Sequence, residues 1–156
     1  MALAAGIKRN LEVQGFRCDA LQFELVEPWL RFNPAICFLV AVLGLSFASP
    51  SIFFWLAAFA AFGVISPHSL GDLIYNRAIR FLTKTPPLPP NPPPRRFACF
   101  IGSTWSIAVA LAFLFGYSFL AYALGIVFLL VVIPMIFWHY CIASLIYQKF
   151  IGYHPA

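Results

Sequence analysis

Three side chains in this sequence are suited to holding a cofactor: His68, His139 and Cys141. Imidazole nitrogens and thiolates are ligands that zinc, haem iron and other transition metals use in proteins. Cys37 and Cys99 add two more thiols, and we expect all three cysteines to lie near the same membrane surface, at the level of the two histidines. No Cys-x-x-Cys pair accompanies them, which is the spacing typical of metal-binding thiols. We therefore favour thiols that pack as small buried apolar groups, and histidines that lie at the membrane interface and are hydrogen-bonded to a neighbour or water. Any cofactor stays unidentified, and no metal site is predicted.

Catalytic motifs are scarce in the rest of the chain. The sequence has no glycine-rich phosphate loop and no His-Glu-x-x-His pattern, and residues 102–106 do not form a nucleophile elbow. Ser103, Thr104 and Ser106 could line a small polar path, although helix hydroxyls more often bond to the carbonyl four residues earlier. We therefore lean against an enzyme.

The segments that must position these residues are strongly apolar. The chain has 156 residues, of which 62% are hydrophobic and 10% charged, whereas soluble domains have about 45 to 50% and about 25%. Residues 32–71 and 97–148 contain no Asp, Glu, Lys or Arg. Each block is about twice the roughly 20 residues that cross a bilayer. The sequence predicts an all-α polytopic membrane protein with four transmembrane helices arranged as two hairpins.

Charge and proline content divide the chain further. In order, we expect a polar cytoplasmic N-terminal segment (1–31), transmembrane hairpin 1 (32–66), an interfacial amphipathic helix (67–85), a proline-rich basic linker (86–96), transmembrane hairpin 2 (97–148) and a cytoplasmic tail (149–156). Seven prolines in the nine residues 86–94 favour a stiff polyproline II spacer between the hairpins.

The distribution of basic residues predicts the topology. All ten lie in the N-terminal segment, the middle of the chain or the tail, and none lies in the turns at 49–51 and 116–118. Under the positive-inside rule, the N-terminus, the middle segment and the C-terminus face the cytoplasm. We expect contact with anionic lipid headgroups or a partner from five basic residues: Arg77, Arg80, Lys84, Arg95 and Arg96.

The two hairpins share a pattern that suggests an internal repeat. Each begins with Arg-Phe and soon a Cys, and each ends with a His that is followed by Leu-Ile-Tyr, a carboxamide and a base. This pattern favours a parallel duplication of a two-helix unit, which would place His68 and His139 at the same membrane depth. Chance matches are frequent in so apolar a chain, so an unduplicated origin stays open.

Several short motifs carry a resemblance to a known family. They are the run from His68 to Arg80, the sequence Thr-Pro-Pro-Leu-Pro-Pro at 85–90, and Arg-Arg-Phe-Ala-Cys at 95–99. Over residues 32–150 the chain resembles small bacterial four-helix integral membrane proteins known only as a domain of unknown function. The resemblance implies a multi-pass protein of the bacterial cytoplasmic (inner) membrane. Members tend to carry a second cysteine three residues after the position of Cys141, which is Ser144 here and argues against dithiol chemistry.

Three functions remain open at this point. We favour a non-catalytic subunit or assembly partner of a larger membrane complex, or a homo-oligomer, because the aromatic-rich spans offer wide lateral contact surfaces. The first alternative is a redox or metal- or haem-binding protein that uses His68, His139 and Cys141. The second is a small-solute channel or transporter. The net charge of +5 is accounted for by topology, so we expect no nucleic-acid partner.

Overall fold

The computed structural model describes residues 5–17 and 23–152, and within these ranges the chain forms helices and connecting turns without a strand. The all-α prediction is therefore confirmed for the described residues. In chain order the elements are α1 (Ala5–Val13), α2 (Phe23–Val26), the 3-10 helix η1 (Glu27–Arg31), α3 (Phe32–Ser46), α4 (Pro50–Ile65), α5 (Leu70–Ile74), the π-helix η2 (Tyr75–Ile79), α6 (Arg80–Thr83), α7 (Pro93–Leu114), α8 (Ser118–Trp138) and α9 (Ile142–Ile151).

Three helices of the described chain are long and apolar enough to cross a membrane: the continuous run Phe23–Ser46, α7 and α8. With 16 residues at about 1.5 Å each, α4 is short of a bilayer core of about 30 Å. It qualifies only together with Leu70–Thr83, from which it is separated by a bend of 77°. These apolar helices indicate a membrane protein, and the described residues hold three candidate spans, or four if the bent pair counts as one. Four separate spans, their orientation and the bacterial inner membrane stay predictions.

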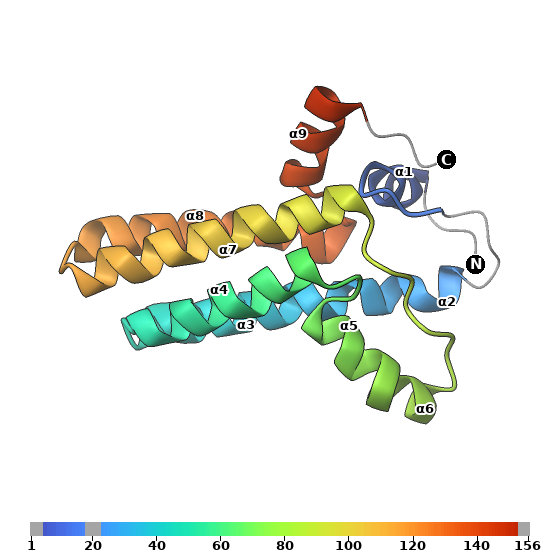
Figure 1. The fold of residues 1–156 in the computed structure, drawn as a ribbon, viewed down its shortest axis with the longest axis horizontal. Helices are drawn as coiled ribbons and strands as arrows, with labels where there is room; N and C mark the ends of the chain where they lie inside the picture. Colours follow the sequence, from blue (N-terminus) through green and yellow to red (C-terminus); the bar gives the residue numbers. More distant parts are fainter. Residues whose placement is uncertain (1–4, 18–22, 153–156) are drawn as a thin grey trace.

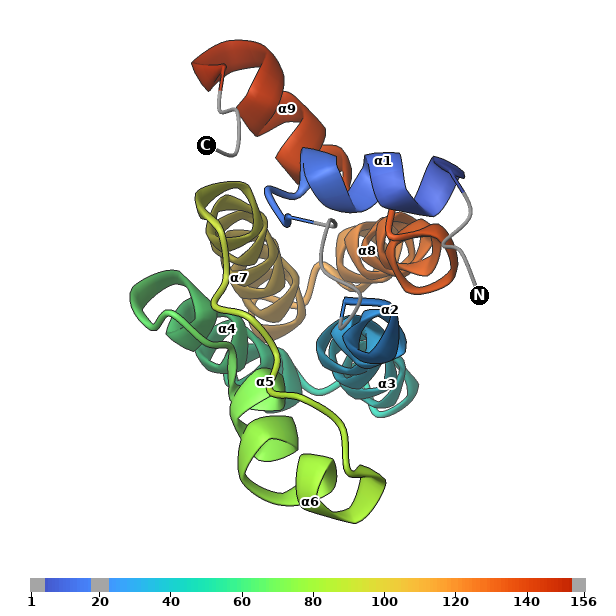
Figure 2. The ribbon, with the colours of Figure 1, turned by 90° about the vertical axis from the view of Figure 1, so that its right-hand side faces the viewer.

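The four long helices pack side by side as two pairs. Helix α4 packs against α7, and α3 packs against both α4 and α8, while α7 also contacts α8 (Figure 1). Their shared core contains two residues from each of α3, α4 and α7: Ala41, Leu45, Phe53, Leu56, Val109 and Ala110. The shorter helices α1, α5, α6 and α9 gather at one end of these pairs, away from the two tight turns (Figures 1 and 2).

Both helix pairs are closed by the same kind of turn. Ala48 and Gly116 have positive φ angles of 45° and 80°. The next residue's N–H then donates to the carbonyl five residues back, from Ser49 to Gly44 at 3.0 Å and from Tyr117 to Ala112 at 2.9 Å. Helix α3 also contacts α5 as α7 contacts α9. These matching features agree with a parallel duplication, which stays a prediction.

The N-terminal segment forms a second small core beside the spans. Its buried members come from the first 30 residues, the bent segment after α4 and the proline-rich stretch: Leu11, Phe16, Phe23, Val26, Leu30, Tyr75 and Leu88. Asn76 holds Leu88 in place, because its Oδ1 accepts from the Leu88 N–H at 2.7 Å. The proline-rich stretch therefore packs onto the protein along part of its length. Helix α7 begins at Pro93, inside the segment expected to be a spacer.

The segments that follow α4 and α8 differ from continuous spans. In the bent segment after α4, Arg77 and Lys84 are exposed, together with Phe81 and Leu82 at 65% and 85%. This composition suits a headgroup layer, and the interfacial location stays a prediction. In the second hairpin, His139 adopts a left-handed φ of 53° and ends α8. Helix α9 then forms separately and runs across position 148, the expected boundary between hairpin 2 and the tail.

Candidate functional site

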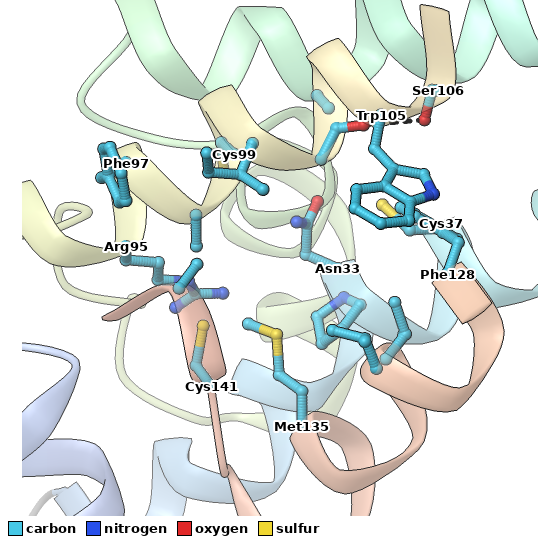
Figure 3. A pocket seen from close by; sticks show the side chains of 18 of the residues that line it. Asn33, Cys37, Arg95, Phe97, Cys99, Trp105, Ser106, Phe128, Met135 and Cys141 are labelled. Carbon is cyan, nitrogen blue, oxygen red and sulfur yellow. Dashed lines mark hydrogen bonds between the residues drawn. The ribbon is translucent and has the colours of Figure 1, made fainter. Parts of the chain in front are cut away.

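A cavity of about 310 Å³ lies between α3, α4, α7, α8 and α9 (Figure 3). Ligand pockets in proteins range from about 300 to 1,000 Å³. Much of its wall is apolar and comes from α4 and α8: Leu56, Phe59, Phe128, Val131, Val132 and Met135. Trp105 of α7 also lies in the wall, and its indole N–H donates to the Leu124 carbonyl at 3.0 Å. The cavity can therefore hold a small apolar molecule.

Three thiols from different elements meet at this cavity. Cys37 of α3, Cys99 of α7 and Cys141 before α9 all contribute to the wall (Figure 3), and all three are free. Sequence reasoning placed them at one level of the membrane, and the shared cavity agrees with that placement. Among the described residues, no group of three or more His, Cys, Asp and Glu side chains is arranged to hold a metal ion.

The polar part of the wall is built at helix starts. Asn33 lies in the first turn of α3, Ser69 is the N-cap of α5, and Arg95 lies in the first turn of α7. Close packing joins the first two elements, because a Cβ atom added at Gly71 would lie 2.7 Å from Asn33 Oδ1. The starts of α3, α5 and α7 thus converge on one end of the cavity.

Arg95 is buried, with 2% of its surface exposed. Its Nη2 lies 3.7 Å from Asp72 Oδ1 and donates to the Leu30 carbonyl at 3.3 Å. The guanidinium also lies over the Phe16 ring, 5.3 Å from its centre. This corrects the expectation that Arg95 contacts lipid headgroups or a partner. Because α7 begins two residues before Arg95, this side chain points into the protein, whereas Arg96 caps a neighbouring helix.

Arg96 donates to the Val64 carbonyl at 2.8 and 2.5 Å and to the Ile65 carbonyl at 3.1 Å. These carbonyls end α4 and have no partner within that helix. Of the remaining basic residues expected at lipid headgroups, Arg80 lies over the Phe81 ring at 4.6 Å. Contact of Arg77, Arg80, Lys84 and Arg96 with headgroups or a partner stays a prediction.

Asp72 sits in a buried network at the start of α5. The Ser69 N–H donates to Asp72 Oδ2 at 3.2 Å, and the Asp72 N–H donates to Ser69 Oγ at 3.3 Å, which is a capping box. With its amide oxygen facing the Ser69 N–H at 3.1 Å, Asn91 donates to Asp72 Oδ2 at 3.3 Å. Asp72 Oδ2 is therefore well bonded, and Asp72 Oδ1 faces Arg95.

Three buried polar atoms at this end have no hydrogen-bond partner among the described residues: Arg95 Nη1, Asn33 Oδ1 and Asp72 Oδ1. Buried polar atoms are normally bonded, and an exception at a cavity points to a ligand or water. Arg95 and Asn33 both belong to the cavity wall. The site thus offers one hydrogen-bond donor and one acceptor next to an apolar space.

His139 is buried outside this cavity, in an ionic cluster. Its Nε2 lies 2.6 Å from Glu27 Oε1 and 3.1 Å from Arg31 Nε, and Arg31 Nη2 bonds Glu27 at 2.5 Å. Burial lowers the pKa of His139, and the hydrogen bond to Glu27 only partly opposes this. From α1 and the residue after it, Asn10 donates to the Trp138 carbonyl and Gln14 to the His139 carbonyl.

His68 lies half-buried at the break between α4 and α5 and is not part of the cavity wall. The structure thus brings Cys141 together with Cys37 and Cys99, and it leaves His68 and His139 elsewhere. The hydroxyls considered for a solute path all donate to backbone carbonyls, Ser103 to one of α4 and the other two within α7. Ser103 donates to the Ala57 carbonyl, Thr104 to Phe100 and Ser106 to Gly102.

Sequence reasoning missed Asn33, Trp105 and the inward position of Arg95. Asn33 was given no binding role, and Arg95 was grouped with the basic residues expected to contact lipid headgroups or a partner. The available signal was the proline run, because proline is common in the first helical turn and predicts an earlier start for α7. With that start, Arg95 would have been placed in the first turn of a buried helix.

Comparison with known proteins places the chain in a family. Neither the curated proteins nor the solved structures that were compared gave a match. A protein-family model matches residues 26–151, which is most of the chain. This confirms the resemblance found in the sequence and extends it by a few residues at its start. The chain belongs to the family described as "Domain of unknown function (DUF4395)".

Proposed function

We propose that this membrane protein binds an apolar molecule from the bilayer in the cavity between α3, α4, α7, α8 and α9. The observation that carries the proposal is an apolar wall that ends at Arg95, a buried guanidinium with an unpartnered nitrogen. Such a combination of apolar surface and a few fixed polar groups is typical of ligand sites. The apolar wall supplies contact area, and Arg95 with Asn33 orients the ligand.

The bilayer is the natural source of this ligand. Ile101 of α7 and Ile146 of α9 line the cavity and are 38% and 46% exposed. The cavity wall is therefore continuous with surface that lipid tails would contact. A molecule dissolved in the bilayer can approach the cavity without crossing water.

Two tryptophans allow binding to be measured within the same chain. Trp105 lies in the cavity wall, while Trp55 of α4 is 77% exposed on the outer surface. One variant keeps only Trp105 and the other only Trp55, with Phe at the remaining tryptophan positions. In lipid nanodiscs, dibromododecane quenches nearby indoles. We expect quenching of Trp105 to saturate at low probe content, while Trp55 reports the probe concentration in the bilayer.

A cavity-filling variant provides the control. A Cβ atom added at Gly102, which lines the cavity, would have no atom within 4 Å, so Gly102→Leu should fill the space without a clash. It should reduce quenching of Trp105 to the level of Trp55. Ala123→Leu adds the same side chain at an exposed position of α8 and should leave quenching unchanged. Equal quenching of Trp105 and Trp55 in the two single-tryptophan variants, without Gly102→Leu, would refute the proposal.

The three thiols favour a second candidate, in which Cys37, Cys99 and Cys141 exchange electrons with the bound molecule. A thiol pair would lose two electrons and two protons to a two-electron acceptor and form a disulfide. Mild oxidation by diamide, in a Cys18→Ala background, should then cause a paired loss of alkylatable thiols. A full set of alkylatable thiols after treatment would remove this candidate and leave the binding proposal intact.

The other hypotheses from the sequence gain no separate support. The outer faces of the long helices suit lipid tails and partner helices equally, so the role as a subunit, assembly partner or homo-oligomer stays a prediction. A solute channel would need free polar groups along the spans. The hydroxyls of Ser103, Thr104 and Ser106 are used in hydrogen bonds to backbone carbonyls.

A further inference from the structure

We infer that the cavity selects a molecule whose polar group is an uncharged carbonyl or hydroxyl, and that it discriminates against carboxylates and phosphates. The inference rests on the proposed binding function and adds the chemical class of the ligand. It follows from two properties of the polar end: its charge balance and its free hydrogen-bonding atoms.

The charges at the polar end already cancel. Arg95 and Asp72 are 2% and 1% exposed, and the two side chains face each other at 3.7 Å. An anionic ligand beside Arg95 would bring a second negative charge next to Asp72 in a site without bulk water. Burial of an ion without its own counter-ion is strongly unfavourable. An uncharged ligand has no such cost.

Two other arginines, Arg96 and Arg31, are committed to other groups. Arg96 directs its guanidinium to the Val64 and Ile65 carbonyls. Arg31 is bonded to Glu27 at 2.5 Å. Neither is part of the cavity wall. Among the described residues of the wall, Arg95 is thus the one cation, and Asp72 balances it.

The free atoms define the group that would bind. Arg95 Nη1 is a donor and needs an acceptor, which a carbonyl oxygen supplies. Asn33 Oδ1 is an acceptor and can receive a hydroxyl proton. The remaining wall is largely apolar. The site therefore fits an uncharged lipid or another apolar molecule that carries an ester, ketone or hydroxyl at one end.

A matched series of probes tests this selectivity in the variant that keeps only Trp105. The probes are terminally dibrominated dodecanoate, its methyl ester and dibromododecane, used at a pH where the acid is ionised. Bilayer concentrations come from the variant that keeps only Trp55. We expect the ester to bind about tenfold more tightly than the alkane, as one hydrogen bond to a charged donor implies. The carboxylate should bind more weakly than both.

Two substitutions check the assignment of roles. Arg95→Met should remove the advantage of the ester over the alkane. Asp72→Asn keeps the shape but leaves the Arg95 charge unbalanced, so it should shift the preference towards the carboxylate. If either variant fails to fold, the relative affinities of ester and carboxylate in the variant that keeps only Trp105 still decide whether the site prefers uncharged ligands.

The outcomes separate this inference from the proposed function. Tighter binding of the carboxylate than of the ester would overturn the inference and leave binding itself established. An ester advantage that survives Arg95→Met would also overturn it. Failure of every probe to quench Trp105 beyond Trp55 would instead refute the proposed function.

Discussion

Gly125 and Gly102 offer a sharp test of helix packing in this fold. A Cβ atom added at Gly125 of α8 would lie 2.4 Å from Leu45 Cδ2 and 3.1 Å from its Cδ1 and Cγ. Leu45 of α3 is buried in the core between the long helices, so it has little freedom to move away. At Gly102 of α7 the same atom would have no neighbour within 4 Å.

The expected magnitude follows from two terms. Replacing a helical Gly by Ala favours the helix by up to about 1 kcal/mol, and this gain applies to both sites. Forcing a methyl group into a filled space costs about 1–3 kcal/mol, and this cost applies only to Gly125. Because the first term cancels in the comparison, Gly125→Ala should be about 1–3 kcal/mol less stable than Gly102→Ala.

The assay is unfolding of the full chain by SDS in mixed micelles, followed by circular dichroism. Gly102→Ala should unfold at or above the SDS content of the parent protein, and Gly125→Ala below it. Shortening the opposing residue by Leu45→Ala should rescue part of the loss in the Gly125→Ala background, because the two sites are in contact. Equal midpoints for the two glycine variants would show that α3 and α8 do not pack as described.

Three further outcomes are expected in the same unfolding assay. Because burial lowers the pKa of His139 below 6.5, the unfolded chain binds its proton more readily, and stability should fall as pH drops below 6.5. His139→Asn should flatten this dependence, and an unchanged slope would contradict the assignment. Arg95→Met should cost about 3–5 kcal/mol by leaving the Asp72 charge buried alone. Adding Asp72→Asn should recover part of that cost, and simple additivity would argue against the pair. Ser103→Ala, which removes the bond to the Ala57 carbonyl, should cost about 0.6 kcal/mol, whereas Thr104→Val should be neutral.

The sequence predicted the helical membrane architecture because charge and hydropathy act over whole segments. A block without charges, such as residues 97–148, can satisfy its backbone in lipid only as helix. The turn at Gly116 was predicted, because a glycine interrupts the apolar run there. Helix α9 was not predicted as a separate element, because the left-handed φ at His139 that precedes it has no glycine to indicate a break.

The candidate site was predicted only in part. Cys141, Cys37 and Cys99 were placed at one membrane level, and the structure puts them on one cavity. The environment of His139 could not be predicted, because it depends on long-range packing. Its hydrogen-bond partner Glu27 lies 112 positions away in the sequence. The inward position of the Arg95 side chain depended on where α7 starts. A run of prolines does not fix that start to better than one helical turn. Charge and hydropathy over whole segments can be predicted from the sequence, whereas the hydrogen-bond partner of one side chain is set by tertiary packing.

The attachment of the N-terminal segment to the far end of the chain constrains the order of assembly. The Gln14 side chain bonds the His139 carbonyl 125 positions later. At synthesis rates of about 5–20 residues per second, that carbonyl is made roughly 6–25 s after Gln14. Until then the Gln14 side chain lacks the hydrogen-bond acceptor that it has at the end of α8. This contact therefore belongs to a late stage of biogenesis, after the ribosome has delivered the last long helix to the membrane.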